Sequence, residues 1–284
     1  MQRIGDITMN NSKGWGIALW CLLFIAGPSH AADLILTAPP RESVEAGSKL
    51  YGPLAKHIGE LIGARVVYQH PRNWLNYQRE MRDNKYDIIF DGPHFISWRI
   101  AHLKNDVLVK LPGTLEFYLV AAADDNKTNT LDDLIGKKIC GISPPNLSTL
   151  TVLDKFRNPV RQPVIVGIKG GMGKVFQSFT SGKCKAAVLR TTFFKKKLKP
   201  EQREKLKILF HSAPLPNQGI SVSQRLSAAA KNKLLQSMTL GNGTKISQDI
   251  VKRFGGKQAK AFIPAKNDEY AGHNMFLEGI IFGW

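Results

Sequence analysis

The chain has 284 residues and a mass of 31.6 kDa, with 43% hydrophobic and 22% charged residues, so it is long enough for one or two domains with large cores. Forty Lys and Arg against 22 Asp and Glu give a net charge of +18, which favours an anionic ligand, surface or polymer. Three cysteines exclude a disulfide-built scaffold, and no apolar run reaches the roughly 18 residues that a membrane-spanning helix needs.

Residues 1–31 predict a secretory signal peptide. A polar, basic segment precedes the apolar run 17–26, and small residues follow up to Ala31, after which we expect cleavage. The alternative is a buried N-terminal helix, which the helix-breaking Gly27-Pro28 pair disfavours. We therefore expect a periplasmic mature chain that carries a net charge of +17 and has no stable membrane insertion.

Export also determines how the charge and the cysteines are interpreted. Nucleic acids are rare partners outside the cytoplasm and no nucleic-acid recognition motif occurs, so we expect no nucleic-acid partner. Cys140 and Cys184 remain after cleavage. They either pair, closing a loop of 44 residues that stabilises the chain by about 4 kcal/mol, or they stay as two buried thiols.

Strand and helix patterns alternate along the mature chain, first over residues 34–90 and again, after a break, over residues 138–189. This alternation predicts two successive α/β units, each with a parallel sheet and helices on both faces. The expected strands are 34–37, 65–68, 86–90, 138–142, 164–166 and 186–189, and the expected helices are 49–62, 74–81, 147–156 and 173–180.

Two segments are candidates for crossings between the units. One is the long strand-like run 114–123, and the other is the proline-rich stretch 211–219, which a strand over 220–222 and a helix over 225–238 follow. Two crossings would form a hinge with a ligand cleft between two lobes, although two rigidly packed domains would give the same pattern. We expect lobe I to comprise residues 32–117 and 218–284, and lobe II residues 118–217.

Basic residues concentrate in the expected lobe II. Residues 118–217 hold 18 Lys and Arg against 7 Asp and Glu, a net charge of +11, which leaves +6 for the rest of the mature chain. Part of this charge is the run 195–199 with Arg203, Lys205 and Lys207, a pattern typical of a solvated helix face. The remaining charge would raise the concentration of an anion near the cleft.

Signatures of catalysis and of metal binding are weak. The histidines are scattered without a metal-ligand spacing, and no nucleophile motif of the Gly-x-Ser-x-Gly type occurs. The stretch 169–174 lacks the glycine and the hydroxyl residue that a nucleoside-triphosphate loop requires at its two ends. We therefore expect a protein that is not an enzyme and needs neither a metal nor another cofactor.

Two helix starts in lobe II are rich in hydrogen-bond donors. One is the glycine stretch 169–174, and the other is the segment 143–149, in which Asn146 can cap the helix while Ser148 and Thr149 add hydroxyls. Free backbone N–H groups and the helix dipole favour an oxyanion by about 0.3–1 kcal/mol at such a place. Each segment could equally be a turn or a cap without a ligand.

The order of several motifs resembles the periplasmic phosphonate-, phosphate- and phosphite-type substrate-binding proteins of ABC transporters, which have the type II binding-protein fold. The similarity covers residues 34–224. It rests on the helix opening Tyr51-Gly-Pro-Leu-Ala55, on Met81 to Ile88 followed by Gly92-Pro93, and on Gly182 before Ala186. This resemblance implies an α/β fold of two lobes around a ligand cleft.

The resemblance also implies ligand-binding positions in the expected lobe I and at the helix starts. The cleft aromatic residues of the family correspond to Trp74 and to Phe95, with His94 beside it. The family's ligand-binding hydroxyls correspond to Ser148 and Thr149. A serine-histidine pair of the family is replaced by Gly171 and Met172, so only backbone N–H groups remain there.

Two acidic residues that hold an ammonium group in aminoalkylphosphonate binders correspond to the uncharged Thr192 and Gln218, with Arg190 nearby. A buried ammonium would lack its counter-charges, which is unfavourable. The resemblance therefore implies an anion without an amino group: phosphate, phosphite, a simple phosphonate or another oxyanion, including one with an organic portion.

The sequence thus predicts a monomeric periplasmic receptor that encloses a small anion and delivers it to an ABC permease. The same protein could instead present its closed form to a histidine kinase or another membrane receptor. An exported enzyme acting on an anionic substrate and an envelope-surface protein held by its basic charge are two further alternatives.

Overall fold

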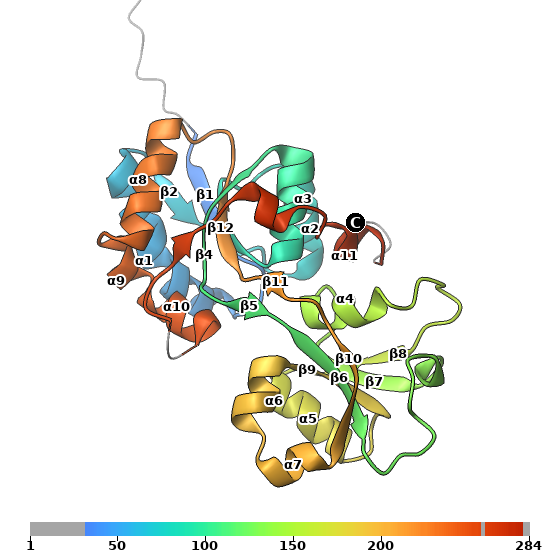
Figure 1. Ribbon diagram of the computed structural model, residues 1–284. Helices are drawn as coiled ribbons and strands as arrows, with labels where there is room; N and C mark the ends of the chain where they lie inside the picture. Colours follow the sequence, from blue (N-terminus) through green and yellow to red (C-terminus); the bar gives the residue numbers. More distant parts are fainter. Residues whose placement is uncertain (1–31, 257–258, 281–284) are drawn as a thin grey trace, which may run out of the picture. The chain divides into compact units, whose positions relative to one another are not determined.

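The structure, a computed structural model, describes residues 32–256 and 259–280. The expected signal peptide and its cleavage after Ala31 lie outside these residues. From Asp33 onward the described chain belongs to one unit, in which two sheets are connected by two short crossings (Figure 1).

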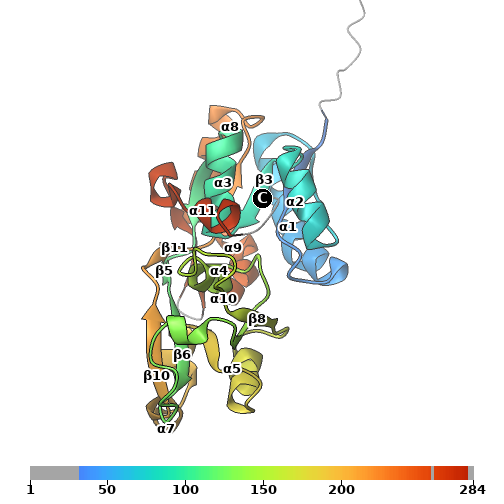
Figure 2. The same ribbon diagram turned by 90° about the vertical axis from the view of Figure 1, so that its right-hand side faces the viewer.

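The larger sheet has six strands in the order β13-β4-β12-β3-β1-β2, and β1 pairs in parallel with both β2 and β3. Helices surround this sheet (Figures 1 and 2). Its strands are β1 (Leu34–Thr37), β2 (Val66–Tyr68), β3 (Ile88–Asp91), β4 (Asp106–Lys110), β12 (Gly219–Val222) and β13 (Ile263–Pro264). The helical segments of this half are α1 (Val44–Ile62), α2 (Trp74–Arg82), α3 (Pro93–Leu103), α8 (Ala228–Thr239), α9 (Gly243–Ile246), α10 (Gln248–Gly255), η2 (Asn267–Tyr270) and α11 (Met275–Glu278).

The smaller sheet has five strands in the order β10-β6-β9-β7-β8. Its strands are β6 (Phe117–Ala122), β7 (Lys138–Gly141), β8 (Val164–Gly167), β9 (Ala186–Arg190) and β10 (Leu206–His211). The helical segments of this half are η1 (Asp132–Leu134), α4 (Leu147–Leu153), α5 (Met172–Thr180), α6 (Thr191–Lys197) and α7 (Pro200–Glu204).

Both sheets are mixed, so the expectation of parallel sheets is wrong for part of each. Strand β12 runs antiparallel to β3 and β4, and β6 runs antiparallel to β9 and β10. The crossings are the cause, because the chain enters the smaller sheet along β6, leaves it along the neighbouring β10 and returns to the larger sheet as β12. The expected strand-helix alternation holds for the parallel pairs β1-β2, β1-β3, β7-β8 and β7-β9.

The expected strand over 114–123 is two strands. The chain forms β5 (Thr114–Leu115), which pairs with β11 (Leu215–Pro216), and then continues after Glu116 as β6 in the smaller sheet. Both crossings therefore lie side by side in a two-stranded ladder that is separate from the two sheets. In Figure 1 this ladder leads from one sheet to the other.

Local capping explains where the helices begin. The side chain of Ser43 accepts a hydrogen bond from the Ala46 backbone N–H, so α1 starts before the apolar periodicity that predicted 49–62. Ser227 caps α8 in the same way, and this helix therefore starts at Ala228 rather than at the expected residue 225. Gly63 ends α1 in the left-handed conformation, with φ of 70°.

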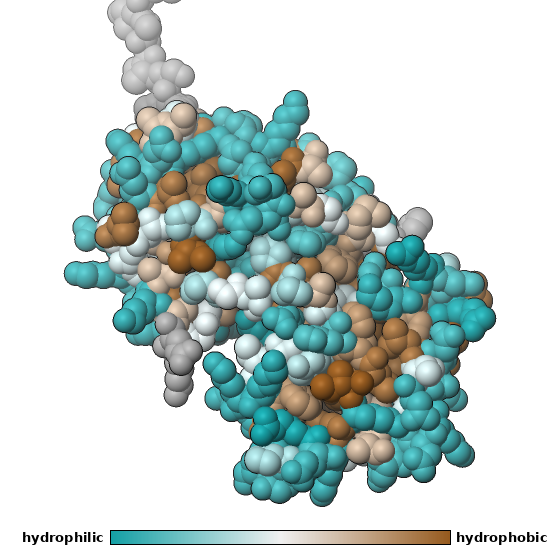
Figure 3. Space-filling model, viewed as in Figure 1, coloured by the Kyte–Doolittle hydropathy of each residue, from teal (hydrophilic) through white to brown (hydrophobic). Residues whose placement is uncertain are grey.

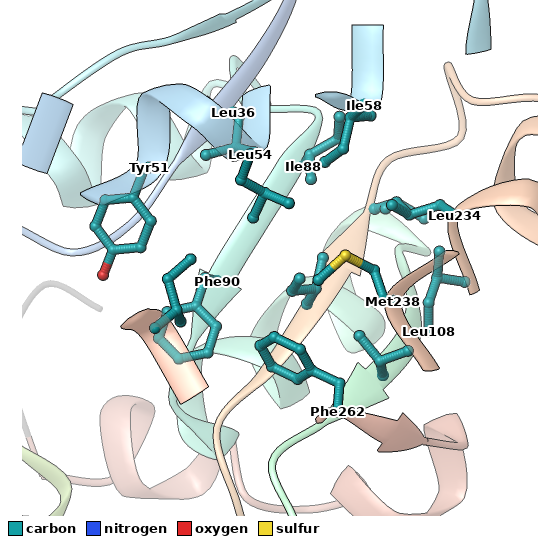
Figure 4. Packing of buried hydrophobic residues seen from close by; sticks show 14 of the residues in the cluster. Leu36, Tyr51, Leu54, Ile58, Ile88, Phe90, Leu108, Leu234, Met238 and Phe262 are labelled. Atoms are coloured by element: carbon teal, nitrogen blue, oxygen red, sulfur yellow. The ribbon is translucent and has the colours of Figure 1, made fainter. Parts of the chain in front are cut away.

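The core of the larger sheet is built from strand residues and from one face of α1 and α8. Leu54 and Ile58 lie at helical spacing and are buried against the sheet, as the sequence pattern predicts, and Tyr51 is buried with them. Figure 4 shows this cluster, in which side chains from helix and strand interdigitate. The labelled members are Leu36, Tyr51, Leu54, Ile58, Ile88, Phe90, Leu108, Leu234, Met238 and Phe262.

Cys140 and Cys184 form a disulfide in the smaller sheet. Cys140 lies on β7, and Cys184 lies two residues before the neighbouring strand β9. Both residues are buried in a cluster with Val120, Val175 and Phe179. Of the two alternatives that the sequence left open, the structure has the bonded one.

The basic run after β9 lies on the surface. Lys195, Lys196, Lys197 and Lys199 are exposed on and between α6 and α7, which agrees with the expectation of a solvated helix face. Figure 3 shows hydrophilic side chains around these helices at the lower end of the molecule. Among the described residues, no helix combines the length and the apolar character needed to cross a membrane.

Candidate functional site

A cavity of about 200 Å³ lies between residues of the two sheets and their helices. It is smaller than the 300–1,000 Å³ of a typical site for a drug-sized ligand, so its size suits a small molecule. Of the described residues, no Asp or Glu lines it. The lining residues are Arg41, Trp74, Gly92, Pro93, His94, Phe95, Leu115, Phe117, Pro145, Asn146, Leu147, Met172, Arg190, Gln218 and Phe254.

The turn after β3 brings the rings of His94 and Phe95 to the cavity. Gly92 precedes α3 in an extended conformation and Pro93 occupies the first helical position, where its fixed φ suits a helix start. His94 and Phe95 follow in the first turn of α3. The ring of Phe95 stacks on that of Trp74, with 6.1 Å between the ring centroids and an interplanar angle of 17°. The two rings form an apolar wall.

Arg41 brings a positive charge to the cavity from the side of the larger sheet. It lies in the loop between β1 and α1, and its Nη1 donates a hydrogen bond of 2.7 Å to Oε1 of Gln218. Its guanidinium also lies over the ring of Phe254 on α10, 5.4 Å from the centroid. These two contacts orient the arginine at the cavity without neutralising it.

Arg190 brings a second positive charge from the smaller sheet. It is the last residue of β9 and the residue before α6. Its Nε is buried and has no hydrogen-bond partner among the described residues. Burial lowers the pKa of the Arg190 guanidinium from its ordinary value, although an arginine remains charged at neutral pH. Within the described chain, neither Arg190 nor Arg41 forms an ion pair with an acidic side chain.

Both expected helix starts reach the cavity, α5 through the expected Met172 and α4 through residues other than the expected hydroxyls. At α4, Asn146 and Leu147 line it. The hydroxyl of Ser148 donates to Oδ1 of Asn146 over 2.7 Å, and the hydroxyl of Thr149 donates to the Ile142 carbonyl over 2.5 Å. Both hydroxyls therefore already donate hydrogen bonds to residues of the loop that precedes α4.

At α5, Met172 lines the cavity as the first helical residue. Gly171, which precedes it with φ of 83°, adopts a left-handed conformation that a side chain would strain, but it does not line the cavity. Thr192 is exposed on α6 and also lies outside the lining.

Six of the ten expected site residues therefore line one cavity, and four do not. The six are Trp74, His94, Phe95, Met172, Arg190 and Gln218, and the four are Ser148, Thr149, Gly171 and Thr192. The sequence analysis missed Arg41 and Phe254. A signal for Arg41 existed, because it follows a parallel strand, and ligands of open α/β sheets bind beyond the carboxyl ends of such strands.

His94 is buried at the cavity in its neutral form. Its Nε2 lies 2.9 Å from the carbonyl oxygen of Pro145, which belongs to the loop before α4. Burial lowers the pKa of His94 to about 3, and the positive charge of Arg41 acts in the same direction. The imidazole is therefore uncharged at neutral pH, and it connects residues of both halves of the chain.

A buried ion pair supports the turn that carries His94. Nε of Arg99 donates to Oδ2 of Asp91 over 3.2 Å, and both side chains are completely buried. The hydroxyl of Tyr77 donates to the same carboxylate oxygen over 2.5 Å. Because Asp91 immediately precedes Gly92, this network holds the end of β3 and the start of α3 in place.

The described residues contain no group of three or more His, Cys, Asp and Glu side chains that could hold a metal ion.

Two sheets, two adjacent crossings and a cavity between the halves constitute a two-lobed type II periplasmic-binding-protein fold. Many solved structures resemble this chain, and three of them follow. A binding-protein component of a phosphonate ABC transporter from Pseudomonas aeruginosa is 16% identical, with a TM-score of 0.55, and the match covers 84% of this chain and 83% of that one. PhnD1 of Prochlorococcus marinus in complex with methylphosphonate is 15% identical, with a TM-score of 0.60, covering 86% and 96%. A Xanthomonas citri protein solved with ATP is 12% identical, with a TM-score of 0.67, covering 88% and 100%.

The family model for the periplasmic phosphonate substrate-binding proteins of ABC transporters matches residues 36–270, and the chain belongs to this family. The match extends beyond residue 224, where the resemblance in the sequence ended. Members of the family are substrate-binding proteins and not enzymes. A curated relative, the phosphate-import protein PhnD of Mycolicibacterium smegmatis, is 24% identical over 124 residues, and the alignment spans 40% of this chain and 38% of the relative.

Proposed function

We propose that this chain captures a small oxyanion, such as phosphate, phosphite or a phosphonate, in the cavity between its lobes and delivers it to an ABC permease. Membership of the phosphonate-binding family supports the transport role, and the relatives solved or named with methylphosphonate and with phosphate import support the ligand class. The proposal includes export of the chain to the periplasm, directed by residues 1–31 and accompanied by their removal.

The observation that carries the proposal is the pair of guanidiniums at the cavity. Arg41 comes from the larger sheet and Arg190 from the smaller one, and no acidic residue in the described part of the chain lines the cavity to neutralise them. A bound oxyanion would accept charge-assisted hydrogen bonds from both, each contributing about 1.5–3 kcal/mol. Micromolar affinity corresponds to a binding free energy of about −8 kcal/mol. These two contacts and a few neutral hydrogen-bond donors are sufficient for this affinity, even after the free energy needed to close the lobes is subtracted.

The lobes of the proposed receptor are residues 32–117 with 218–284 and residues 118–217. An anion contacted from both lobes would hold them together, in the manner of hinged closure around a ligand. The apolar wall of Trp74 and Phe95, together with Met172, leaves room for a small organic group on the anion, as in an alkylphosphonate. The ligand set proposed from the resemblance also includes Ser148 and Thr149, whose hydroxyls would have to exchange their present partners to reach the anion.

Isothermal titration calorimetry on the chain that begins at Ala32 tests this function. Phosphate, phosphite, methylphosphonate and sulfate are titrated into the wild type and into the variants Arg190→Gln and Arg203→Gln. Both variants lose one positive charge, but Arg203 lies on α7 and does not line the cavity. We expect saturable binding of at least one oxyanion, weakened about tenfold or more by Arg190→Gln and unchanged by Arg203→Gln. Equal weakening by both variants, or no saturable binding, would contradict the proposal.

Delivery to a permease is tested separately in cells. Deleting the gene should slow growth when the best-bound oxyanion is the sole source of its element at low concentration. Complementation with the wild type should restore growth, whereas complementation with Arg190→Gln should not. Normal growth of the deletion strain under these conditions would argue against a role in uptake.

A further inference from the structure

The cavity contains a hydrogen-bond acceptor besides its positive charges. Nδ1 of His94 is buried and has no hydrogen-bond partner among the described residues, while the residue as a whole is 3% exposed. Buried polar atoms in native proteins nearly always have a partner. Since His94 lines the cavity, a ligand bound there can provide the hydrogen-bond partner of Nδ1.

The contact on the other side of the ring determines that Nδ1 accepts. Nε2 faces the carbonyl oxygen of Pro145 at 2.9 Å, and a carbonyl can only accept a hydrogen bond, so Nε2 must carry the proton. A neutral imidazole with the proton on Nε2 has a lone pair on Nδ1. Burial keeps the ring neutral, because it lowers the pKa of His94 to about 3. The ligand atom that meets Nδ1 therefore has to donate a proton.

Gly92 places this acceptor close to a cationic donor. A Cβ atom added to Gly92 would lie 3.2 Å from Nδ1 of His94 and 4.0 Å from Nη2 of Arg41. An acceptor and a positively charged donor thus border the same small space beside the glycine backbone. A hydroxyl and an ionised oxygen on one ligand atom would match these two groups at once.

We infer that His94 makes this cavity selective for oxyanions that still carry a proton, with Nδ1 accepting from the P–O–H group and Arg41 donating to an ionised oxygen of the same ligand. The inference rests on the proposed function and names the ionisation state of its ligand. Hydrogenphosphate and phosphonate monoanions have the required hydroxyl, whereas sulfate has none. An ammonium group could also donate to Nδ1, but no carboxylate from residues 32–256 or 259–280 lines the cavity to neutralise it.

Two substitutions separate acceptance by Nδ1 from the contact made by Nε2. In His94→Asn, the amide oxygen reaches the place of Nδ1 and keeps an acceptor there, but the contact with Pro145 is lost. In His94→Gln, the amide nitrogen reaches the place of Nε2 and keeps that contact, but the acceptor at Nδ1 is lost. The two variants are therefore matched controls for each other.

The affinities of phosphate and sulfate are measured by calorimetry at neutral pH for the wild type and for both variants. We expect the wild type to prefer phosphate by about tenfold or more, since a buried acceptor without a partner disfavours sulfate. His94→Asn should retain this preference, and His94→Gln should lose most of it. Retention by His94→Gln with loss in His94→Asn would overturn the inference and assign His94 a purely positioning role through Pro145.

A pH titration with methylphosphonate provides an independent readout on the wild type. Affinity should fall as the pH rises through the second ionisation of the ligand, because the dianion has no proton to donate. Among the described residues, the charged and titratable groups that act on His94 are Arg41 and His273, and burial lowers the pKa of His273, so this second histidine stays uncharged over that range. Affinity that rises with pH would overturn the inference.

The proposed function and the role of His94 can be refuted separately. If no oxyanion binds to the wild type, the proposed function is wrong. If phosphate and sulfate bind to it equally tightly, the function stands and the role assigned to His94 is wrong.

Discussion

Replacing Arg99 with methionine tests whether the buried ion pair beneath the cavity is required for the fold. Arg99 and Asp91 are both completely buried, and the guanidinium donates to Asp91 over 3.2 Å and to the hydroxyl of Tyr77 over 3.0 Å. Methionine approximates the length of the side chain but leaves the carboxylate buried without its counter-charge. Breaking such a pair from one side destabilises proteins by about 3–5 kcal/mol.

Thermal and urea unfolding followed by circular dichroism measure this loss. For a chain of this size, about 1 kcal/mol shifts Tm by about 2–4 °C, so Arg99→Met should lower Tm by about 6–20 °C. Arg65→Met is the matched control, because Arg65 pairs with Asp33 over 3.3 Å with its side chain 77% exposed. Exposed pairs contribute about 0–1 kcal/mol, and the control should therefore unfold close to the wild type.

The pH dependence identifies the cause of the loss. Burial raises the pKa of Asp91 even when Arg99 opposes it, and removing Arg99 raises that pKa further. A carboxyl whose pKa is raised in the folded state contributes stability below its unfolded pKa and loses it as the pH rises. The deficit of Arg99→Met should therefore shrink as the pH falls toward about 4. A deficit equal to that of Arg65→Met, or one independent of pH, would show that the buried charge of Asp91 does not cause the loss.

Three further outcomes are expected. Replacing Cys140 and Cys184 with alanine should lower the free energy of unfolding by about 4 kcal/mol, because the bond closes a loop of 44 residues; equal stability of the wild type with and without a reductant would contradict this. His94 has a pKa lowered to about 3, so its contribution is complete above the unfolded pKa near 6.5 and is lost as the pH falls. Between about pH 7 and about pH 4.5, the free energy of unfolding measured in urea should fall by about 3 kcal/mol more for the wild type than for His94→Gln. An equal fall for both proteins would exclude the low pKa of His94. Thr149→Val should lower stability by about 1–3 kcal/mol in urea unfolding, since the Ile142 carbonyl loses its partner, and an unchanged midpoint would show that this hydrogen bond contributes nothing.

Local patterns of apolar residues were sufficient to predict the strands that pair in parallel and the helices between them. The spacing of Leu54 and Ile58 predicted the buried face of α1, and the apolar runs ending at Thr37 and Phe90 predicted β1 and most of β3. Strand direction was not predictable in the same way. Direction depends on where the chain crosses between sheets, and no property of residues 220–222 themselves distinguishes an antiparallel strand from a parallel one.

The candidate site was predictable where the chemistry lies in one short segment. Gly92-Pro93 is a helix start that can be recognised from the sequence, and it placed His94 and Phe95 at the cavity. Ser148 and Thr149 carry the expected hydroxyls, but these hydroxyls already donate hydrogen bonds to the loop before α4. Such hydrogen bonds depend on three-dimensional geometry, which the sequence does not give.

Long-range contacts account for the residues that the sequence analysis missed. Arg41 reaches the cavity because Gln218, which lies 177 positions along the chain, accepts its hydrogen bond, and because Phe254 supports its guanidinium. No spacing in the sequence reports such a contact. The tertiary fold alone assembles the pair of positive charges from Arg41 and Arg190.

The most direct test of the central claim is calorimetric titration of phosphate and methylphosphonate into the wild type, Arg190→Gln and the double variant Arg41→Gln with Arg190→Gln. We expect one saturable site in the wild type, weaker binding in the single variant and no measurable binding in the double variant, with all three proteins folded by circular dichroism. Undiminished oxyanion binding by the folded double variant would contradict the claim that the two arginines hold the ligand.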